Sequence, residues 1–384
     1  MSTKEFWQEV KFPLFSFIVW RVTLFLFLLL AVKFLPLQKN FLGGGMGNYL
    51  KAPWFWAWSN FDGEHYISIA QRGYGFAEQA FFPLYPLLIK TIIQLFNKDL
   101  TTFTLVAFII SNFSFLVTLL GLYKLIKLDY KEKVARLSII LLLLFPTSFY
   151  FGSVYTESLF LAFVIWSFYF ARKNKLLYAG FLGFFAALTR TIGIILFPVL
   201  IIELFKNRQS SYRSLKTIYL LLIPLGLLTY MFYLNQTTGD PLKFIHTLPS
   251  FGEQRSTTLI LLPQVFYRYI FKIIPNLNFS YFPIVFTTLL EFITAIFFSA
   301  ALVIGFIKLK LSYSLYLILG LLVPAFSGSF SSLPRYVLVL FPAFVLMALY
   351  FRKAPRFFKY LVFSIMFVIL FITTSLFVRG YWIS

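Results

Sequence analysis

Apolar residues run through most of the chain in long segments, and short polar stretches separate one segment from the next. Eleven of these segments are about 15 to 25 residues long, the length that a helix rising 1.5 Å per residue needs to cross ~30 Å of hydrocarbon. They cover residues 14–36, 102–123, 137–153, 157–171, 176–190, 191–205, 217–234, 280–306, 312–331, 336–351 and 360–378. The pattern predicts an all-α, polytopic membrane protein with roughly eleven transmembrane helices.

Basic residues are concentrated in short runs between these segments. Five runs hold 18 lysines and arginines in 39 residues, whereas two longer polar loops hold only 9 in 110 residues. Under the positive-inside rule, the dense runs face the cytoplasm. Eleven alternating spans place all five on one side, so the first long loop (37–101) and the second long loop (235–279) are predicted to face outward. The five runs are 124–136, 172–175, 206–216, 308–310 and 352–359.

Composition agrees with a membrane protein and excludes several kinds of site. Hydrophobic residues make up 60% of the chain, charged residues 12%, and the mean hydropathy is +0.84. The net charge of +21 lies largely in loops between apolar segments, so we interpret it as membrane topology and predict no nucleic-acid partner. The chain has no cysteine, which excludes disulfides, cysteine-ligated metals and a thiol nucleophile.

The chain shows no internal repeat and no linker, so we predict a single integral membrane domain over residues 1–384. The only glycine cluster, "GGGMG" at 43–47, follows no strand and precedes no Lys-Ser or Lys-Thr pair, which indicates a flexible loop rather than a phosphate-binding loop. The chemistry is therefore expected to use no bound nucleotide.

The first long loop contains an unusually polar stretch, "WSNFDGEHYISIAQRGYG" at 58–75. Apolar positions between residues 60 and 72 fit a short amphipathic helix lying on the membrane, with Asp62 in its first turn and Gly73 at its end. Asp62 has two interpretations: it caps the helix, or it accepts a proton from a substrate hydroxyl at the membrane boundary. The tryptophans, His65 and Tyr66 around it offer faces that suit a sugar ring as well as a membrane interface.

This stretch resembles the signature of the PIG-V type mannosyltransferases, the GPI mannosyltransferase II family and its prokaryotic relatives. It is followed by "AFFPLYPLLIK" at 80–90, as in that family. The chain departs from the family pattern at Ser59–Asn60 and just before Arg255, where an aromatic residue is common. Further matching pieces are "FPTSFYFGSVYTESLF" at 145–160, "LTRTIGI" at 188–194, "TTGDPLKFIHTLPSFGEQR" at 237–255 and "LPRYVLVLFPAF" at 333–344.

The resemblance implies a GT-C type glycosyltransferase fold and a GPI-anchor-biosynthesis-like reaction. Such an enzyme moves a sugar, expected to be mannose, from a polyprenyl-phosphate donor to a glycolipid or cell-envelope acceptor on the outer face. It implies that Asp62 is the catalytic base and that arginines meet the lipid phosphate. The substrate-binding candidates are Glu64, His65, Tyr66, Glu157, Arg190, Asp240, Arg255 and Arg335.

Each candidate also has an ordinary structural interpretation. Glu157 suits the cap of a helix, and each arginine suits an interfacial anchor. No cofactor is predicted, with a divalent metal at Asp62, Glu64 and His65 kept as an alternative. Glu291 lies deep in an apolar segment, which indicates a paired, protonated or functional carboxyl group.

Two functions other than glycosyl transfer are also considered, those of a transporter and of a scaffold. A transporter or flippase of lipid-linked sugars predicts internal repeats and polar residues near the membrane midplane, and the sequence shows little of either apart from Glu291. A noncatalytic scaffold leaves the polar motif at 58–75 without a purpose. We therefore expect a multi-pass glycosyltransferase of a prokaryotic cell membrane, in contact with membrane lipids, with an outward active site.

Overall fold

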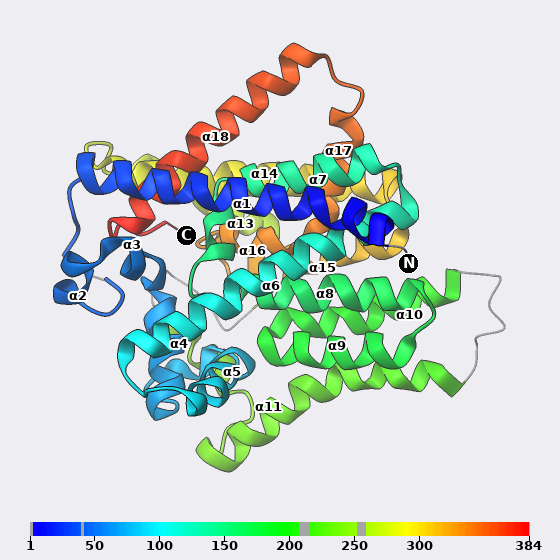
Figure 1. Cartoon of the computed structure of the whole chain (residues 1–384), viewed down its shortest axis with the longest axis horizontal. Coiled ribbons are helices and arrows are strands. Elements are labelled where there is room, and N and C mark those ends of the chain that lie inside the picture. The colour runs from blue at the N-terminus through cyan, green and yellow to red at the C-terminus, as the bar shows by residue number, and fades with distance from the viewer. Residues whose placement is uncertain (1–2, 40–41, 207–214, 252–258, 384) are drawn as a thin grey trace.

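The computed structural model describes residues 3–39, 42–206, 215–251 and 259–383. Within these ranges every regular element is a helix (Figure 1). The long helices are α1 (Thr3–Phe34), α6 (Leu100–Asp129), α8 (Glu157–Arg172), α11 (Leu222–Thr238), α14 (Phe282–Lys308) and α18 (Arg356–Val378).

Shorter helices connect and flank them. In the first half of the chain these are α2 (Met46–Lys51), α3 (Pro53–Trp56), η1 (Ala57–Ser59), α4 (Asp62–Arg72), η2 (Glu78–Ala80), α5 (Leu84–Ile92), η3 (Ile93–Leu95), α7 (Glu132–Leu144), η4 (Ser148–Gly152), α9 (Leu176–Thr189), η5 (Thr191–Ile195) and α10 (Leu196–Lys206). In the second half they are η6 (Leu215–Leu221), α12 (Lys243–His246), η7 (Leu248–Phe251), α13 (Leu262–Arg268), η8 (Tyr269–Ile273), η9 (Ile274–Asn276), α15 (Leu311–Ala325), α16 (Leu333–Tyr336), η10 (Val337–Val339) and α17 (Phe341–Phe351).

Five helices form a continuous row, in which each packs against the next in the order α1, α6, α8, α9 and α11 (Figure 1). Glycines allow the close approach at the end of this row. A side chain at Gly180 of α9 would overlap the main-chain carbonyl of Tyr219, and one at Gly226 of α11 would overlap that of Phe184. Small residues at such crossings allow helix backbones to approach closely where lipid supplies no hydrophobic driving force.

A second group of helices packs against this row. α14 contacts α15 and α17, and α17 contacts α7. α18 contacts α1, so the first and the last long helix pack against each other. α16 and η10 precede α17 with a bend of 80°, which makes this segment a broken span or a re-entrant loop by shape. Backbone of this kind is tolerated at membrane depth where protein surrounds it.

The described residues contain five helices that are long and apolar enough to cross a membrane, or six if the bent pair counts as one span. Shorter apolar helices lie at 84–95, 176–189, 191–204 and 311–325. The prediction of an all-helical membrane protein is thus confirmed, whereas the predicted count of roughly eleven spans stays a prediction. The first long loop holds the helices α2 to α5, and α4 begins and ends close to the predicted bounds.

Charged side chains bring several of the basic runs together at one end of the helices. Arg172, the last residue of α8, lies 2.5 Å from Asp129 at the end of α6 and 2.6 Å from Glu203 in α10. Lys310, just before α15, also pairs with Asp129. Four segments that carry basic runs or adjoin them therefore meet at one end of the bundle.

Candidate active site

The main chain before Asp62 is fixed by a fully buried asparagine. The Asn60 side chain accepts a hydrogen bond of 2.6 Å from the Gly43 N–H and donates one of 3.0 Å to the Phe377 carbonyl. Its own carbonyl accepts from the Tyr155 hydroxyl at 2.9 Å. Distant segments thus hold the residue two positions before Asp62.

Phe61 then turns the chain into α4 with a φ of 56°, a left-handed conformation that is unusual for a non-glycine residue. Its ring is held by Trp382 at 5.1 Å, edge to face, and by Phe377 at 5.8 Å. Strained backbone of this kind persists only where its surroundings over-determine it, and it clusters at functional sites. The turn makes Asp62 the first residue of α4, and no side chain forms a cap at this terminus.

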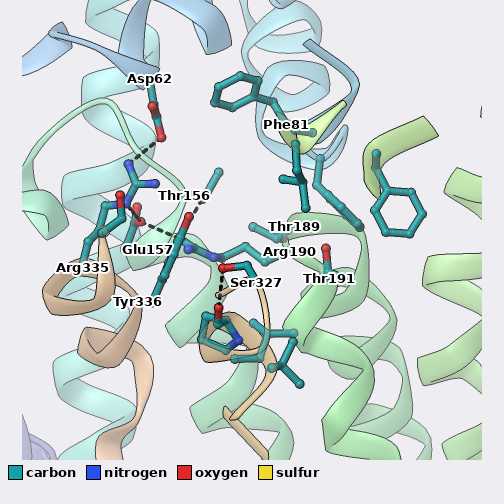
Figure 2. Close-up of a pocket in the computed structure, with 18 of the residues that line it drawn as sticks. Asp62, Phe81, Thr156, Glu157, Thr189, Arg190, Thr191, Ser327, Arg335 and Tyr336 are labelled. Atoms are coloured by element: carbon teal, nitrogen blue, oxygen red, sulfur yellow. Dashed lines mark hydrogen bonds and ion pairs between the residues drawn. The ribbon is translucent and has the colours of Figure 1, made fainter. Parts of the chain in front are cut away.

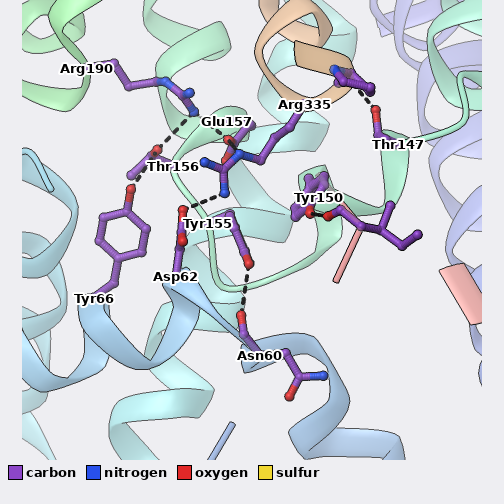
Figure 3. Close-up of polar contacts among 12 residues, drawn as sticks. Asn60, Asp62, Tyr66, Thr147, Tyr150, Tyr155, Thr156, Glu157, Arg190 and Arg335 are labelled. Atoms are coloured by element: carbon purple, nitrogen blue, oxygen red, sulfur yellow. Dashed lines mark hydrogen bonds and ion pairs between the residues drawn. The ribbon is translucent and has the colours of Figure 1, made fainter. Parts of the chain in front are cut away.

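Asp62 instead belongs to an alternating chain of two carboxylates and two arginines (Figure 3). Arg335 Nη1 lies 2.5 Å from Asp62 Oδ2, and Arg335 Nε lies 3.5 Å from Glu157 Oε1. Arg190 Nη1 lies 2.5 Å from the same oxygen of Glu157. Asp62 and Glu157 are thus paired with arginines in addition to their positions in the first turns of α4 and α8.

The first turn of α8 and the end of α9 supply the middle of this chain. Glu157 is the first residue of α8, and its side chain is only 1% exposed. Arg190 directly follows α9, in an extended conformation that carries its side chain back toward Glu157. The position of a carboxylate at a helix N-terminus is favourable by itself, because it complements the helix dipole.

Aromatic rings surround the arginine that meets Asp62. The Arg335 guanidinium lies 5.6, 5.5 and 5.3 Å from the ring centres of Tyr150, Tyr155 and Tyr336. Cation–π contacts of this length stabilise a desolvated guanidinium. The Thr147 hydroxyl donates a 2.7 Å hydrogen bond to the main-chain carbonyl of Pro334, the residue before Arg335. The loop before α8 therefore also holds the main chain of α16.

All four charged side chains line one cavity of about 800 Å³ (Figure 2). Its polar wall consists of the charged chain, Glu64, His65 and hydroxyl groups from Thr156, Thr189, Thr191 and Ser327. Much of the remaining lining is apolar, and this set is called the apolar wall below. It is formed by Phe81, Phe82, Phe244, Ile245, Leu248, Leu259, Val323, Pro324 and Phe326.

Tyr66 also lines the cavity, and most of its side chain is buried in the protein. Its hydroxyl is 3.3 Å from the Thr156 hydroxyl, which in turn is 3.4 Å from Arg190 Nη1. Burial raises the pKa of Tyr66, and the carboxylates of Asp62 and Glu157 raise it further. Tyr66 is therefore a neutral hydroxyl at physiological pH and links α4 to the Arg190 end of the chain.

His65 faces the cavity and is oriented by its neighbours. Its ring stacks on Phe81 at 4.8 Å between centres, and its Nδ1 lies 3.4 Å from Glu78 Oε1. Glu78 is almost fully buried and also accepts from Arg72 at 2.9 Å and from the Gly75 N–H at 2.6 Å. The turn after α4 thus returns to hold a residue of α4.

The remaining sequence candidates lie elsewhere. Asp240 is outside the cavity lining and lies 2.7 Å from His246 Nδ1, and this hydrogen bond lowers the pKa of Asp240. Arg255 lies outside the described residues. Glu291 accepts hydrogen bonds from the Tyr269 hydroxyl at 2.8 Å and the Ser332 N–H at 3.3 Å, which identifies partners for this intramembrane carboxyl group.

The tryptophans near Asp62 serve mainly as core. Trp56 and Trp58 are buried and do not line the cavity, although Trp54 is exposed. Trp58 packs against the guanidinium of Arg21 at 4.3 Å. The aromatic surface that the cavity does offer comes from other places, including Phe81 and Trp382.

Several cavity residues were not anticipated from the sequence. Thr156 and Tyr336 sit next to Glu157 and Arg335 in the chain, so adjacency within the matching motifs is the signal that could have found them. Ser327 and Trp382 lie outside the pieces of the sequence that match the family pattern, so no motif pointed to them.

The site combines groups for proton transfer and for anion binding in one cavity. A carboxylate near an open cavity can accept a proton from a hydroxyl, and two guanidinium groups can stabilise a departing phosphate. Among the residues that the structure describes, no three His, Cys, Asp or Glu side chains come together as a metal site. One carboxylate oxygen of Asp62 is already paired with the Arg335 guanidinium.

Comparisons with known proteins were made for the whole chain. No curated protein matches it. Among solved structures, the Archaeoglobus fulgidus oligosaccharyltransferase aligns with TM-scores of 0.49, in complex with Zn and sulfate, and 0.47, in the apo form. Both alignments have 11% identity and cover 96% of this chain but 53% and 56% of the other, so this chain spans about half the length of that protein.

A family comparison gives a direct assignment. The sequence model described as Mannosyltransferase (PIG-V) matches residues 15–242, which is more than half of the chain. The match includes Asp62, Glu157 and Arg190, whereas Arg335 lies beyond it. The chain belongs to the PIG-V family of membrane mannosyltransferases.

Proposed function

We propose that the protein transfers mannose from a polyprenyl-phosphate donor to a hydroxyl of a glycolipid or cell-envelope acceptor, with inversion at the sugar. The observation that carries the proposal is one cavity lined by a carboxylate, Asp62, and by two arginines, Arg190 and Arg335. Family membership favours this enzyme over a transporter of the same lipids.

Each group has a defined part in the proposed reaction. The acceptor oxygen attacks the anomeric carbon while its proton passes to the Asp62 carboxylate. The bond between that carbon and the phosphate oxygen breaks, and its electron pair stays on the phosphate. Arg190 and Arg335 offset the negative charge that develops there. The reaction needs no covalent intermediate on the protein.

The apolar wall of the cavity supports a lipid-linked donor. Leu259, Val323, Pro324 and Phe326 line the same cavity as Arg335 and Ser327, so a polar head and an apolar tail could be bound at the same time. A nucleotide sugar would place a second phosphate and a base against these apolar side chains. Burying such polar groups without partners is unfavourable.

We further propose that the cavity opens toward the outer face. Glu157 and Arg172 are the first and last residues of α8, whose 16 residues span ~24 Å at 1.5 Å per residue. The cavity therefore lies at the end of α8 opposite the end that carries the basic runs, and these runs favour the cytoplasm.

The test uses purified protein in lipid nanodiscs. Polyprenyl-phosphate mannose should give acceptor mannosylation, and GDP-mannose should give none without a lipid carrier. Arg335→Ala should raise the apparent KM for the lipid donor. Transfer from GDP-mannose in lipid-carrier-free nanodiscs would contradict the proposed donor, and absence of transfer from any mannosyl donor would contradict the proposed activity.

A further inference from the structure

Arg335 has two carboxylates within reach but makes a full contact with only one. Its Nη1 is 2.5 Å from Asp62, whereas its Nε is 3.5 Å from Glu157 Oε1, too far for a strong hydrogen bond. Over the described part of the chain, Arg335 Nε and Glu157 Oε2 are both buried and have no hydrogen-bond partner. Arg335 and Glu157, which lie side by side (Figure 3), thus each carry one polar atom that the present pairing leaves unused.

Unsatisfied buried polar atoms are rare in folded proteins and require an explanation. A second arrangement of Arg335 accounts for both atoms. If the guanidinium turns from Asp62 toward Glu157, its fork can pair with the free oxygen while Arg190 keeps the other oxygen at 2.5 Å. Arginine and carboxylate groups favour such two-pronged contacts.

The pairing of Arg335 with Asp62 is expected to be favoured only while the cavity contains no anion. Asp62, Arg335, Glu157 and Arg190 alternate in sign and sum to zero. A lipid phosphate that enters the cavity adds negative charge beside Asp62 and attracts the guanidinium that Asp62 holds. The phosphate and Asp62 then compete for one side chain.

We propose that the donor phosphate displaces Asp62 from Arg335, which moves to the phosphate and Glu157, so that Asp62 is free to accept a proton only when donor is bound. This rests on the proposed function, in which Asp62 is the base. It makes binding ordered, with donor before acceptor. It also assigns Glu157 the role of a positioning residue that receives Arg335 after the exchange.

The test measures binding of polyprenyl phosphate, which lacks the sugar and cannot react, to the purified protein in nanodiscs. Asp62→Asn removes the charge that competes for Arg335 and leaves only the weaker hydrogen bond of a neutral amide, so the Kd should fall about tenfold, the size expected for loss of one charge-assisted hydrogen bond. Glu64→Gln is the matched control, because Glu64 lines the same cavity two residues later without an ion pair to Arg335. It removes the same charge and should change the Kd far less. Asp62→Ser provides a second variant if Asp62→Asn folds poorly.

Repeating both substitutions in the Arg335→Ala protein gives a double-mutant cycle. There the substitution Asp62→Asn should tighten binding no more than Glu64→Gln does. An equal effect of Asp62→Asn and Glu64→Gln in the native background, or a tenfold gain that persists without Arg335, would overturn the exchange. Both results leave donor binding intact and so differ from failure of the proposed function, in which the native protein binds no polyprenyl phosphate.

Order of binding gives an independent readout. With the exchange, product-inhibition kinetics should show that acceptor binds only to the donor complex, and Glu157→Gln should lower kcat more than it changes the donor Kd. Random binding of the two substrates by the native enzyme would also overturn the proposal.

Discussion

The Tyr155 hydroxyl donates a 2.9 Å hydrogen bond to the main-chain carbonyl of Asn60, across 95 residues of sequence. Both residues are buried. The loop that precedes Glu157 in α8 is thereby tied to the loop that precedes Asp62 in α4. The two carboxylates that share Arg335 are held at a fixed separation by this link as well as by the arginine itself.

The substitution Tyr155→Phe tests that link. It removes this donor from the buried carbonyl of Asn60, which keeps a 3.2 Å hydrogen bond from the Gly63 N–H, at a cost of about 0.5–1.5 kcal/mol. The melting temperature in detergent should fall modestly, and sugar transfer should fall with a change in kcat rather than in donor affinity. Tyr85→Phe is a useful control, because its buried hydroxyl donates to the Ala107 carbonyl at 2.8 Å and neither residue lines the cavity. An equal loss of kcat in both variants would argue against a positioning role for Tyr155.

The substitution Asp62→Asn tests the proposed base. General-base assistance contributes typically ~10² to 10⁴ in rate, so transfer should fall at least about a hundredfold. Asparagine keeps the shape of the side chain and can still accept a hydrogen bond from Arg335, so the melting temperature should stay near that of the native protein. Assays with polyprenyl-phosphate mannose and thermal melts measure the two effects. Retention of most activity would move the base to Glu64 or Glu157.

The ion cluster at the other end of α8 should matter for stability and not for chemistry. Arg172→Ala leaves the buried carboxylates of Asp129 and Glu203 without this arginine, and breaking a buried pair typically costs about 3–5 kcal/mol. The matched control is Arg136→Ala, whose partner Glu132 is exposed and whose pair contributes about 0–1 kcal/mol. Thermal melts should separate the two variants clearly.

Sugar transfer per folded molecule should also be compared between Arg172→Ala and Arg136→Ala. Both variants should retain the native donor KM, since neither arginine lines the cavity. A large rise in KM for Arg172→Ala with an unchanged melting temperature would show that the cluster acts on the site instead of on the fold.

The sidedness of the molecule can be tested directly because the chain has no cysteine. Cysteines introduced singly at Lys173 and Ser250, both exposed, should react with a membrane-impermeant maleimide from opposite sides of sealed vesicles. Labelling of both from the same side would remove the proposed outward site. Detergent-permeabilised vesicles, in which both cysteines should react, control for accessibility.

Motifs in the sequence predicted which residues meet but not how they meet. Asp62, Glu157, Arg190 and Arg335 were all candidates, and all four line one cavity. A motif records spacing along one segment, whereas the order of the ion pairs depends on which helix ends pack together. The pairing of Asp62 with Arg335 therefore required the fold.

The number of membrane-spanning helices could not be fixed from the sequence, because buried loops are as apolar as the spans. The predicted span 137–153 ends in the structure as α7 followed by the irregular segment around η4, whose Phe149 and Phe151 are fully buried. Buried loops of a membrane protein are as apolar as its spans, so hydropathy cannot distinguish them. The tryptophans beside Asp62 show the same ambiguity, since a core position and a sugar-binding face favour the same ring.

The separation of Asp62 and Arg335 by 273 residues has a consequence for biosynthesis. Translation at ~5–20 residues per second delivers the arginine roughly 14–55 s after the aspartate. Throughout that interval the nascent chain holds a carboxylate whose counterion has not been made, although Glu157 and Arg190 are made well before Arg335 and can pair with each other. Ribosome-bound chains that end before residue 335 should therefore be the forms most dependent on membrane insertases and most exposed to quality-control proteases.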